Sequence, residues 1–285
     1  MRVIFVPVAD RPECARALRC AFELGNNLGS SLIGSHIRPH RYSGVKLPSE
    51  LKVFSDYDAS WESAWHGKKT IKSDVAARGL FAKVAGKYGY EMSKNARATP
   101  AAIWQEKVGS PDKIMSINGP LSDLIVVTRP AEKGGKLAEV FMMAALLNSG
   151  RPVLVLPHAG AATVGKHITI AWNQSAEAAR AVASIMPMLQ AAESVSIVWC
   201  GPEGGAGPKS SQLVNYLKFW GVKATRQKLS GKNEGAAITK AAKAAGSDLI
   251  VMGAYSRSRL RQRIFGGVTE HMLSKADLPV CMLHS

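Results

Sequence analysis

The residues with the clearest capacity for chemistry lie in one stretch near the end of the chain, Ser247 to Thr269. Its apolar run, Leu249 to Met252, is short and rich in branched side chains, which is typical of a buried strand. The strand is expected to stop at Gly253, and an arginine-rich loop then closes on Gly266 and Gly267, where a helix should begin. This layout favours phosphate, because glycine allows close backbone approach and the first amides of a helix lack partners within it.

The same stretch resembles the nucleotide motif of the universal stress protein family. That motif runs glycine, two residues, glycine, nine residues, glycine, and then serine or threonine. Gly253 and Gly266 match its first and third glycines, whereas Ser256 stands at the second and Gly267 at the hydroxyl position. The alternative interpretation is that these glycines only shape a strand-to-helix turn, since a glycine pattern alone has low specificity.

The resemblance implies a binding site for ATP or AMP in the second half of the chain. The loop after its first strand and the end of its fourth strand would form two walls, and the start of the following helix would surround the phosphates and ribose. The implied site residues are Ala171, Trp172, Asn173, Met252, Gly253, Ser256, Gly266, Gly267, Val268 and Thr269.

The departures from the family pattern predict weak binding. Asn173 replaces the usual aspartate and keeps its hydrogen-bonding shape without its charge. Ser256 adds a Cβ where backbone room is needed, and Gly267 lacks the hydroxyl that Thr269 can supply nearby. In the first half, Thr128 stands where Gly253 stands in the second, and no glycine pair follows it. That half is therefore expected to lack a nucleotide site and to serve as a structural partner.

An internal repeat organises the chain. The segment Ser122 to Thr128 agrees with Ser247 to Gly253 at five of seven positions, 125 residues apart. The strand expected at 151–156 resembles the one at 278–283 in the same way. Repetition at a fixed spacing indicates copies of one structural unit, so two domains are predicted, residues 1–160 and 161–285.

Strands alternate with helices in both copies, which predicts an α/β fold with two tandem open parallel sheets. The resemblance implies the same fold, Rossmann-like and similar to the adenine-nucleotide α-hydrolases, with the domains packed as a pseudo-dimer. The last strands of the copies, 153–156 and 280–283, are edge candidates that are expected to contact each other. One continuous helix is expected over 176–190, capped by Ser175.

Composition narrows the class of protein. No run approaches the roughly 18 consecutive apolar residues of a membrane span, so no membrane partner is expected. The cysteines, Cys14, Cys20, Cys200 and Cys281, lack metal-like or redox spacing. Reduced thiols in a cytoplasmic protein, without a metal site, are therefore predicted. The net charge of +16 favours anionic partners.

Three classes of function remain open. The first is a stress-response or signalling protein that binds ATP or AMP weakly in its second domain, with at most slow ATP hydrolysis; no catalytic residue is assigned. The second is a protein-interaction or structural module whose nucleotide site has decayed. The third is nucleic-acid binding through the arginines between 257 and 263, which ranks below the others. A homodimer is a further hypothesis.

Overall fold

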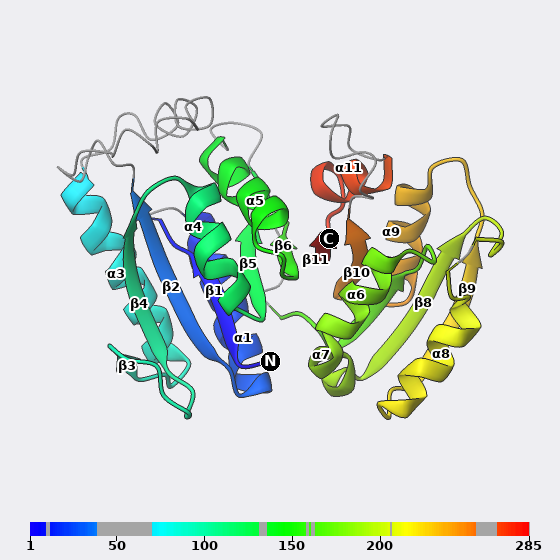
Figure 1. Ribbon diagram of the computed structural model, residues 1–285, viewed down its shortest axis with the longest axis horizontal. Coiled ribbons are helices and arrows are strands. Elements are labelled where there is room, and N and C mark those ends of the chain that lie inside the picture. The colour runs from blue at the N-terminus through cyan, green and yellow to red at the C-terminus, as the bar shows by residue number, and fades with distance from the viewer. Residues whose placement is uncertain are drawn as a thin grey trace. The chain divides into compact units, whose positions relative to one another are not determined.

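The computed structural model describes residues 1–9, 12–38, 70–130, 136–157, 160, 163–205, 207–254 and 267–284. The chain divides into two compact units, Arg2–Ser149 and Gly150–Ser285, and Met1 is grouped with the second. Each unit is built on parallel strands with helices on both faces (Figure 1). The repeat boundary that the sequence places between residues 160 and 161 stays a prediction.

The first unit alternates strands and helices along the chain. Its elements are β1 (Val3–Pro7), α1 (Pro12–Leu28), β2 (Ser31–Arg38), α3 (Thr70–Lys87), β3 (Met92–Ser93), β4 (Ala102–Val108), α4 (Pro111–Asn118), the 3-10 turn η3 (Gly119–Leu121), β5 (Leu124–Thr128) and α5 (Lys136–Asn148). The strands follow the order β3-β4-β2-β1-β5 and all pair in parallel. Helix α1 packs against α3, and α4 packs against α5. Because both faces are covered, every residue of β5 is buried.

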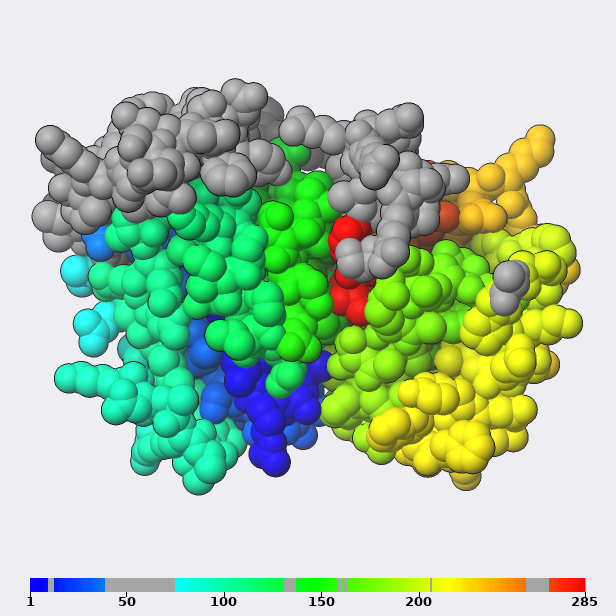
Figure 2. All heavy atoms as spheres, in the orientation of Figure 1, coloured from blue at the N-terminus to red at the C-terminus, as the bar shows by residue number. Residues whose placement is uncertain are grey.

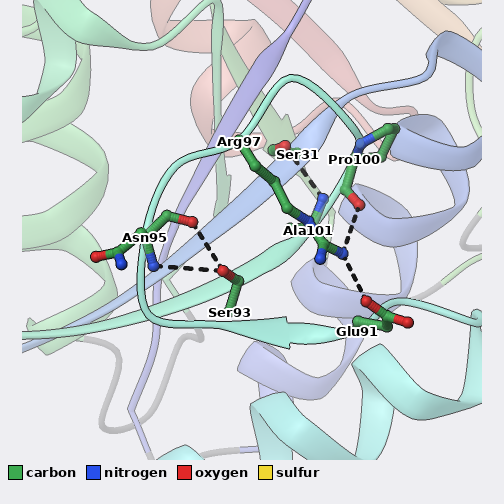
Figure 3. A network of polar contacts seen from close by, with 7 residues as sticks. All are labelled: Ser31, Glu91, Ser93, Asn95, Arg97, Pro100 and Ala101. Carbon is green, nitrogen blue, oxygen red and sulfur yellow. Dashed lines mark hydrogen bonds and ion pairs between the residues drawn. The ribbon is translucent and has the colours of Figure 1, made fainter.

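The two-residue strand β3 was not expected from the sequence, and its connection to β4 is held by a small polar network (Figure 3). The Arg97 guanidinium donates to the Glu91 carboxylate at 2.9 Å and to the Pro100 carbonyl oxygen at 3.5 Å. The Ser93 hydroxyl donates to the Asn95 carbonyl oxygen at 2.8 Å. These bonds fix the turn that brings the chain into β4.

The second unit repeats this plan and adds an antiparallel strand. Its elements are β6 (Val153–Leu156), β7 (His167–Ala171), α6 (Ala176–Ser184), α7 (Met186–Ala191), β8 (Ser194–Cys200), α8 (Ser210–Phe219), β9 (Ala224–Leu229), α9 (Glu234–Ala244), β10 (Leu249–Ala254), α11 (Gly267–Ser274) and β11 (Val280–His284). The strand order is β6-β11-β10-β7-β8-β9. Only the β6–β11 pairing is antiparallel among these neighbours, and it confirms the expected contact between the two strands.

The expected continuous helix over 176–190 is instead two helices, α6 and α7, separated at Ile185. Pro187 explains the break, because a proline has no backbone N–H and its ring clashes with the carbonyl four residues earlier. Proline is tolerated in a first helical turn, where α7 carries it. The predicted cap is confirmed: the Ala178 amide donates to the Ser175 hydroxyl oxygen at 3.1 Å.

The aspartates of the repeated segments have the same task in both units. In the second unit the Asp248 carboxylate accepts bonds from the amides of Gly165, Lys166 and His167, at 2.9, 2.9 and 3.2 Å. In the first unit Asp123 accepts from the amides that begin β1. Asp123 therefore fastens the start of β1 to the start of β5, and Asp248 fastens the start of β7 to the start of β10.

Candidate functional site

A cavity of about 750 Å³ opens at the carboxyl ends of β7, β8 and β10. In an open parallel sheet, ligands bind beyond the carboxyl ends of the strands, where the strand order reverses. Here that point lies between β7 and β10, because β7 is followed along the chain by its neighbour β8 on one side and β10 by its neighbour β11 on the other. The volume is in the range that holds a small organic ligand.

The structure brings most of the predicted site residues together around this cavity. Eight of them line it: Ala171, Trp172, Asn173, Met252, Gly253, Gly267, Val268 and Thr269. Ser256 and Gly266 lie outside the described residues, as do the arginines between 257 and 263. Two walls therefore come from the ends of β7 and β10, and a third from the first turn of α11.

The loop after β7 is fixed by its own side chains. The Asn173 side-chain oxygen accepts a bond from the Ser175 amide at 3.2 Å, which orients the Asn173 amide group. Among the described residues, its side-chain nitrogen has no hydrogen-bond partner. Asn173 consequently offers donors to a ligand, whereas the aspartate expected from the family pattern would offer only acceptors.

A further wall comes from the loop between β8 and α8, which the sequence analysis did not assign to the site. Gln174 has a left-handed backbone (φ 61°), and its side-chain nitrogen donates to the Gly207 carbonyl oxygen at 2.8 Å. The Trp172 indole N–H donates to the Pro208 carbonyl oxygen at 2.8 Å. A Cβ on Gly207 would lie 1.7 Å from the Gln174 carbonyl oxygen, so only glycine allows this closure.

The first glycine of the motif, Gly253, is required by packing. A Cβ placed there would lie 2.5 Å from the Ala178 amide nitrogen and 2.7 Å from the Glu177 carbonyl carbon, both in the first turn of α6. The close approach of α6 to β10 therefore accounts for this glycine without a ligand. Gly267 differs, because a Cβ there would meet no atom within 4 Å.

The described walls of the cavity carry more acid than base. They include the carboxylates Glu177, Glu203 and Glu234 and one lysine, Lys232. Glu203 is engaged, since it accepts bonds from the Ser210 amide and hydroxyl at the start of α8. At the start of α11, which also lines the cavity, the first amides have no partner within their helix and carry the positive end of its dipole.

Cys200 also lines the cavity, at the end of β8. Burial, with a smaller contribution from the Glu234 carboxylate, raises the pKa of the Cys200 thiol above its usual value. The other three cysteines are buried, and none of the four forms a disulfide. Cys200 is thus the thiol through which the cavity can be probed chemically.

Two residues near the motif lie apart from the cavity. Asp248 sits at the amino end of β10, where it binds the amides that begin β7. His271 of α11 packs against Gly235 of α9, since a Cβ on Gly235 would lie 2.7 Å from the His271 side chain. Among the described residues, no group of three or more His, Cys, Asp or Glu is placed to hold a metal ion.

The corresponding position of the first unit holds a far smaller space. There the cavity between the ends of β1 and β5 measures about 30 Å³ and is lined by Thr128 and by side chains of α1 and α5. Leu137 of α5 is buried and Phe141 also lines this space. Among the described residues, the side chains of α1 and α5 thus leave less room here than the second unit has.

The fold and cavity define an open, mostly parallel α/β protein with a ligand-sized site at its strand-order reversal. Residues 167–284 match the model of the universal stress protein family. This part of the chain is therefore a universal stress protein domain. No curated protein sequence matches the chain significantly. No helix in the described parts of the chain is long and apolar enough to cross a membrane.

Solved structures show that the likeness in fold extends over the whole chain. A universal stress protein from Archaeoglobus fulgidus superposes with a TM-score of 0.68 at 15% identity, covering 99% of this chain and 98% of that one. A putative universal stress protein from Pseudomonas aeruginosa gives a TM-score of 0.57 at 14% identity, covering 100% and 93%. At such identities the likeness shows the fold alone.

Proposed function

We propose that this protein is a universal stress protein that binds ATP or AMP weakly in its second unit and acts in a stress response or in signalling. The observation that carries the proposal is the cavity of about 750 Å³ in which the ends of β7 and β10 meet the start of α11. A helix N-terminus favours a phosphate, and the Asn173 side-chain nitrogen can donate to a ribose hydroxyl or a ring nitrogen of adenine.

The balance of charge favours binding without fast turnover. Phosphoryl transfer is accelerated by cationic groups and donors aimed at the charge that develops on the phosphate oxygens. The described walls offer Lys232 against three carboxylates, which disfavours additional negative charge. Slow hydrolysis of ATP is the most that we propose.

Cys200 provides a direct test, because a nucleotide in the cavity would cover its thiol. The intact protein is treated with N-ethylmaleimide with and without millimolar ATP or AMP, and labelling at each cysteine is followed by peptide mass spectrometry. Labelling of Cys200 is expected to slow in the presence of nucleotide. The buried Cys20 and Cys281 provide the internal control, since they should label only as the protein unfolds.

Isothermal titration of wild type and Cys200→Ser with ATP and AMP gives a second readout that does not depend on labelling. Heat of binding in both proteins, together with protection of Cys200, supports the proposal. If neither nucleotide binds nor protects, the site has decayed and the chain is an interaction or structural module. A response to nucleic acid that falls steeply with salt would instead favour the arginine-rich segment outside the described residues.

We further propose a cytoplasmic location, which the four reduced thiols support. A homodimer is a further hypothesis, and measuring the molecular mass of the protein in solution would test it.

A further inference from the structure

Exposed aromatic side chains gather at the carboxyl-terminal end of α8. The exposed fractions are 40% for Tyr216, 90% for Phe219 and 46% for Trp220. Figure 2 shows the surface of α8 in yellow, at one end of the second unit. Their spacing of three and four residues puts these side chains on neighbouring positions of one helical turn. Clustered exposed apolar groups of this size on a soluble protein indicate an interaction surface.

The segment that carries these aromatics is basic throughout. Residues 204–233 contain six cationic side chains and no acidic one: Lys209, Lys218, Lys223, Arg226, Lys228 and Lys232. Lys218 and Lys223 flank the aromatic pair Phe219 and Trp220, and both are exposed. Neither makes an ion pair with a described residue. The acidic residue before β8, Glu193, is already paired with Lys166 at 3.1 Å.

The backbone groups of the turn at this tip form hydrogen bonds within the protein. The Val222 amide donates to the Leu217 carbonyl oxygen and the Gly221 amide to that of Lys218, both at 3.0 Å. Gly221 has a φ of 74°, which completes the usual glycine-terminated end of a helix. The Trp220 carbonyl oxygen accepts from the Gln190 side chain at 3.2 Å. Removing this turn from water would therefore cost little in lost backbone hydrogen bonds.

We propose that this tip, Tyr216 to Lys223, docks on an anionic phospholipid surface. Phe219 and Trp220 enter the headgroup layer, where aromatic rings partition well, while Lys218 and Lys223 keep their ammonium groups at the phosphates. Charge complementarity supports this partner, because an anionic leaflet attracts a cluster of unpaired lysines and the chain as a whole carries +16.

Two other partners fit the surface less well. A nucleic-acid base stacks on a ring that lies flat against the protein with one face free. Phe219 instead projects almost wholly into solvent, and the rings of Tyr216 and Trp220 already pack edge to face, with centroids 6.4 Å apart. A second copy of this chain would bring lysine against lysine in a symmetric contact.

The proposal revises the expectation that no membrane partner exists. That expectation rested on the absence of a long apolar run, and a peripheral contact needs none. Three aromatics close to two lysines are too short a pattern to stand out in the sequence, and the exposure of Phe219 depends on where α8 ends.

Flotation of the full-length protein with vesicles tests the proposal. Vesicles of phosphatidylcholine containing about 30% phosphatidylglycerol are compared with pure phosphatidylcholine, at about 0.1 and 0.5 M salt. Wild type is expected to float with the anionic vesicles only and to be released at high salt. Phe219→Ser should lower the partition coefficient about tenfold, and Lys218→Gln or Lys223→Gln about fivefold each.

Matched controls remove the same kind of group elsewhere. Leu121→Ser replaces an apolar side chain that is 77% exposed in the first unit, and Lys240→Gln removes an exposed lysine of α9. Both should bind the anionic vesicles as wild type does. Because all the altered side chains are exposed, circular dichroism should show unchanged folding.

Three results would overturn the proposal. The first is no flotation with anionic vesicles, and the second is flotation that Phe219→Ser and the lysine variants leave unchanged. The third is binding to single-stranded DNA or RNA that Phe219→Ser abolishes, without any binding to vesicles, which would assign the tip to nucleic acid.

Discussion

Replacing Gly253 by alanine separates packing from ligand binding at the first glycine of the motif. The added Cβ would lie 2.5 Å from the Ala178 amide nitrogen and 2.7 Å from the Glu177 carbonyl carbon. Both are backbone atoms of the first turn of α6, so no side-chain rotation relieves the contact. Such overpacking costs about 1–3 kcal/mol of unfolding free energy, and each kcal/mol lowers Tm by about 2–4 °C in a protein of this size.

Urea denaturation followed by circular dichroism measures this loss, with Gly267→Ala as the matched control. A Cβ at Gly267 meets no atom within 4 Å, and alanine is favoured over glycine in a helix, by up to about 1 kcal/mol. Gly267→Ala should therefore be as stable as wild type or slightly more so. If Gly253→Ala is as stable as wild type, packing does not require this glycine. If the variant is as stable as wild type but no longer responds to ATP, the glycine serves the ligand instead.

Three further outcomes follow from the described contacts. Asp248→Asn should lower the unfolding free energy by about 1–3 kcal/mol in urea denaturation, because a neutral amide oxygen replaces a carboxylate that accepts three amide bonds; a change below a few tenths would contradict this. Burial, reinforced by Arg180 and opposed by Glu177, lowers the pKa of His284 below its usual 6.5. Stability is then present above pH 6.5 and lost as pH falls toward the folded pKa, since the unfolded chain takes up the proton first; His284→Gln should show a smaller loss between pH 7 and 5, and an equal loss would exclude this histidine as the cause. Glu234→Gln should strengthen ATP binding more than AMP binding in calorimetry, because ATP carries more negative charge into a wall rich in carboxylates; an equal effect on both would show that Glu234 lies away from the phosphates.

The architecture was predictable from the sequence because its signals are local. The run Leu249 to Met252 and its copy in the first half are apolar, branched and bounded by polar residues, and both form buried strands. The hydroxyl of Ser175 caps α6 as expected. The helix predicted over 176–190 is too long, because Pro187 interrupts a pattern that is otherwise helical.

The candidate site was predictable in part. The resemblance picked out residues that surround the cavity, but the wall formed by the loop before α8 depends on contacts between distant residues. Gln174 donates a hydrogen bond to Gly207, which lies 33 residues later in the sequence, and neither residue type predicts that bond. The sequence likewise does not predict that packing requires a glycine at position 253, because this depends on how closely α6 approaches β10.

The pairing of β6 with β11 bears on how the protein can be shortened. β6 comes before the repeat boundary predicted at residue 161, yet it belongs to the second compact unit and pairs with β11 from Val280 to Met282. A fragment of residues 161–285 would keep the whole family domain but leave this apolar edge without its neighbour, and exposed edges recruit strands from other chains. Such a fragment should therefore self-associate more strongly than one that begins at residue 150, in which β6 still covers β11.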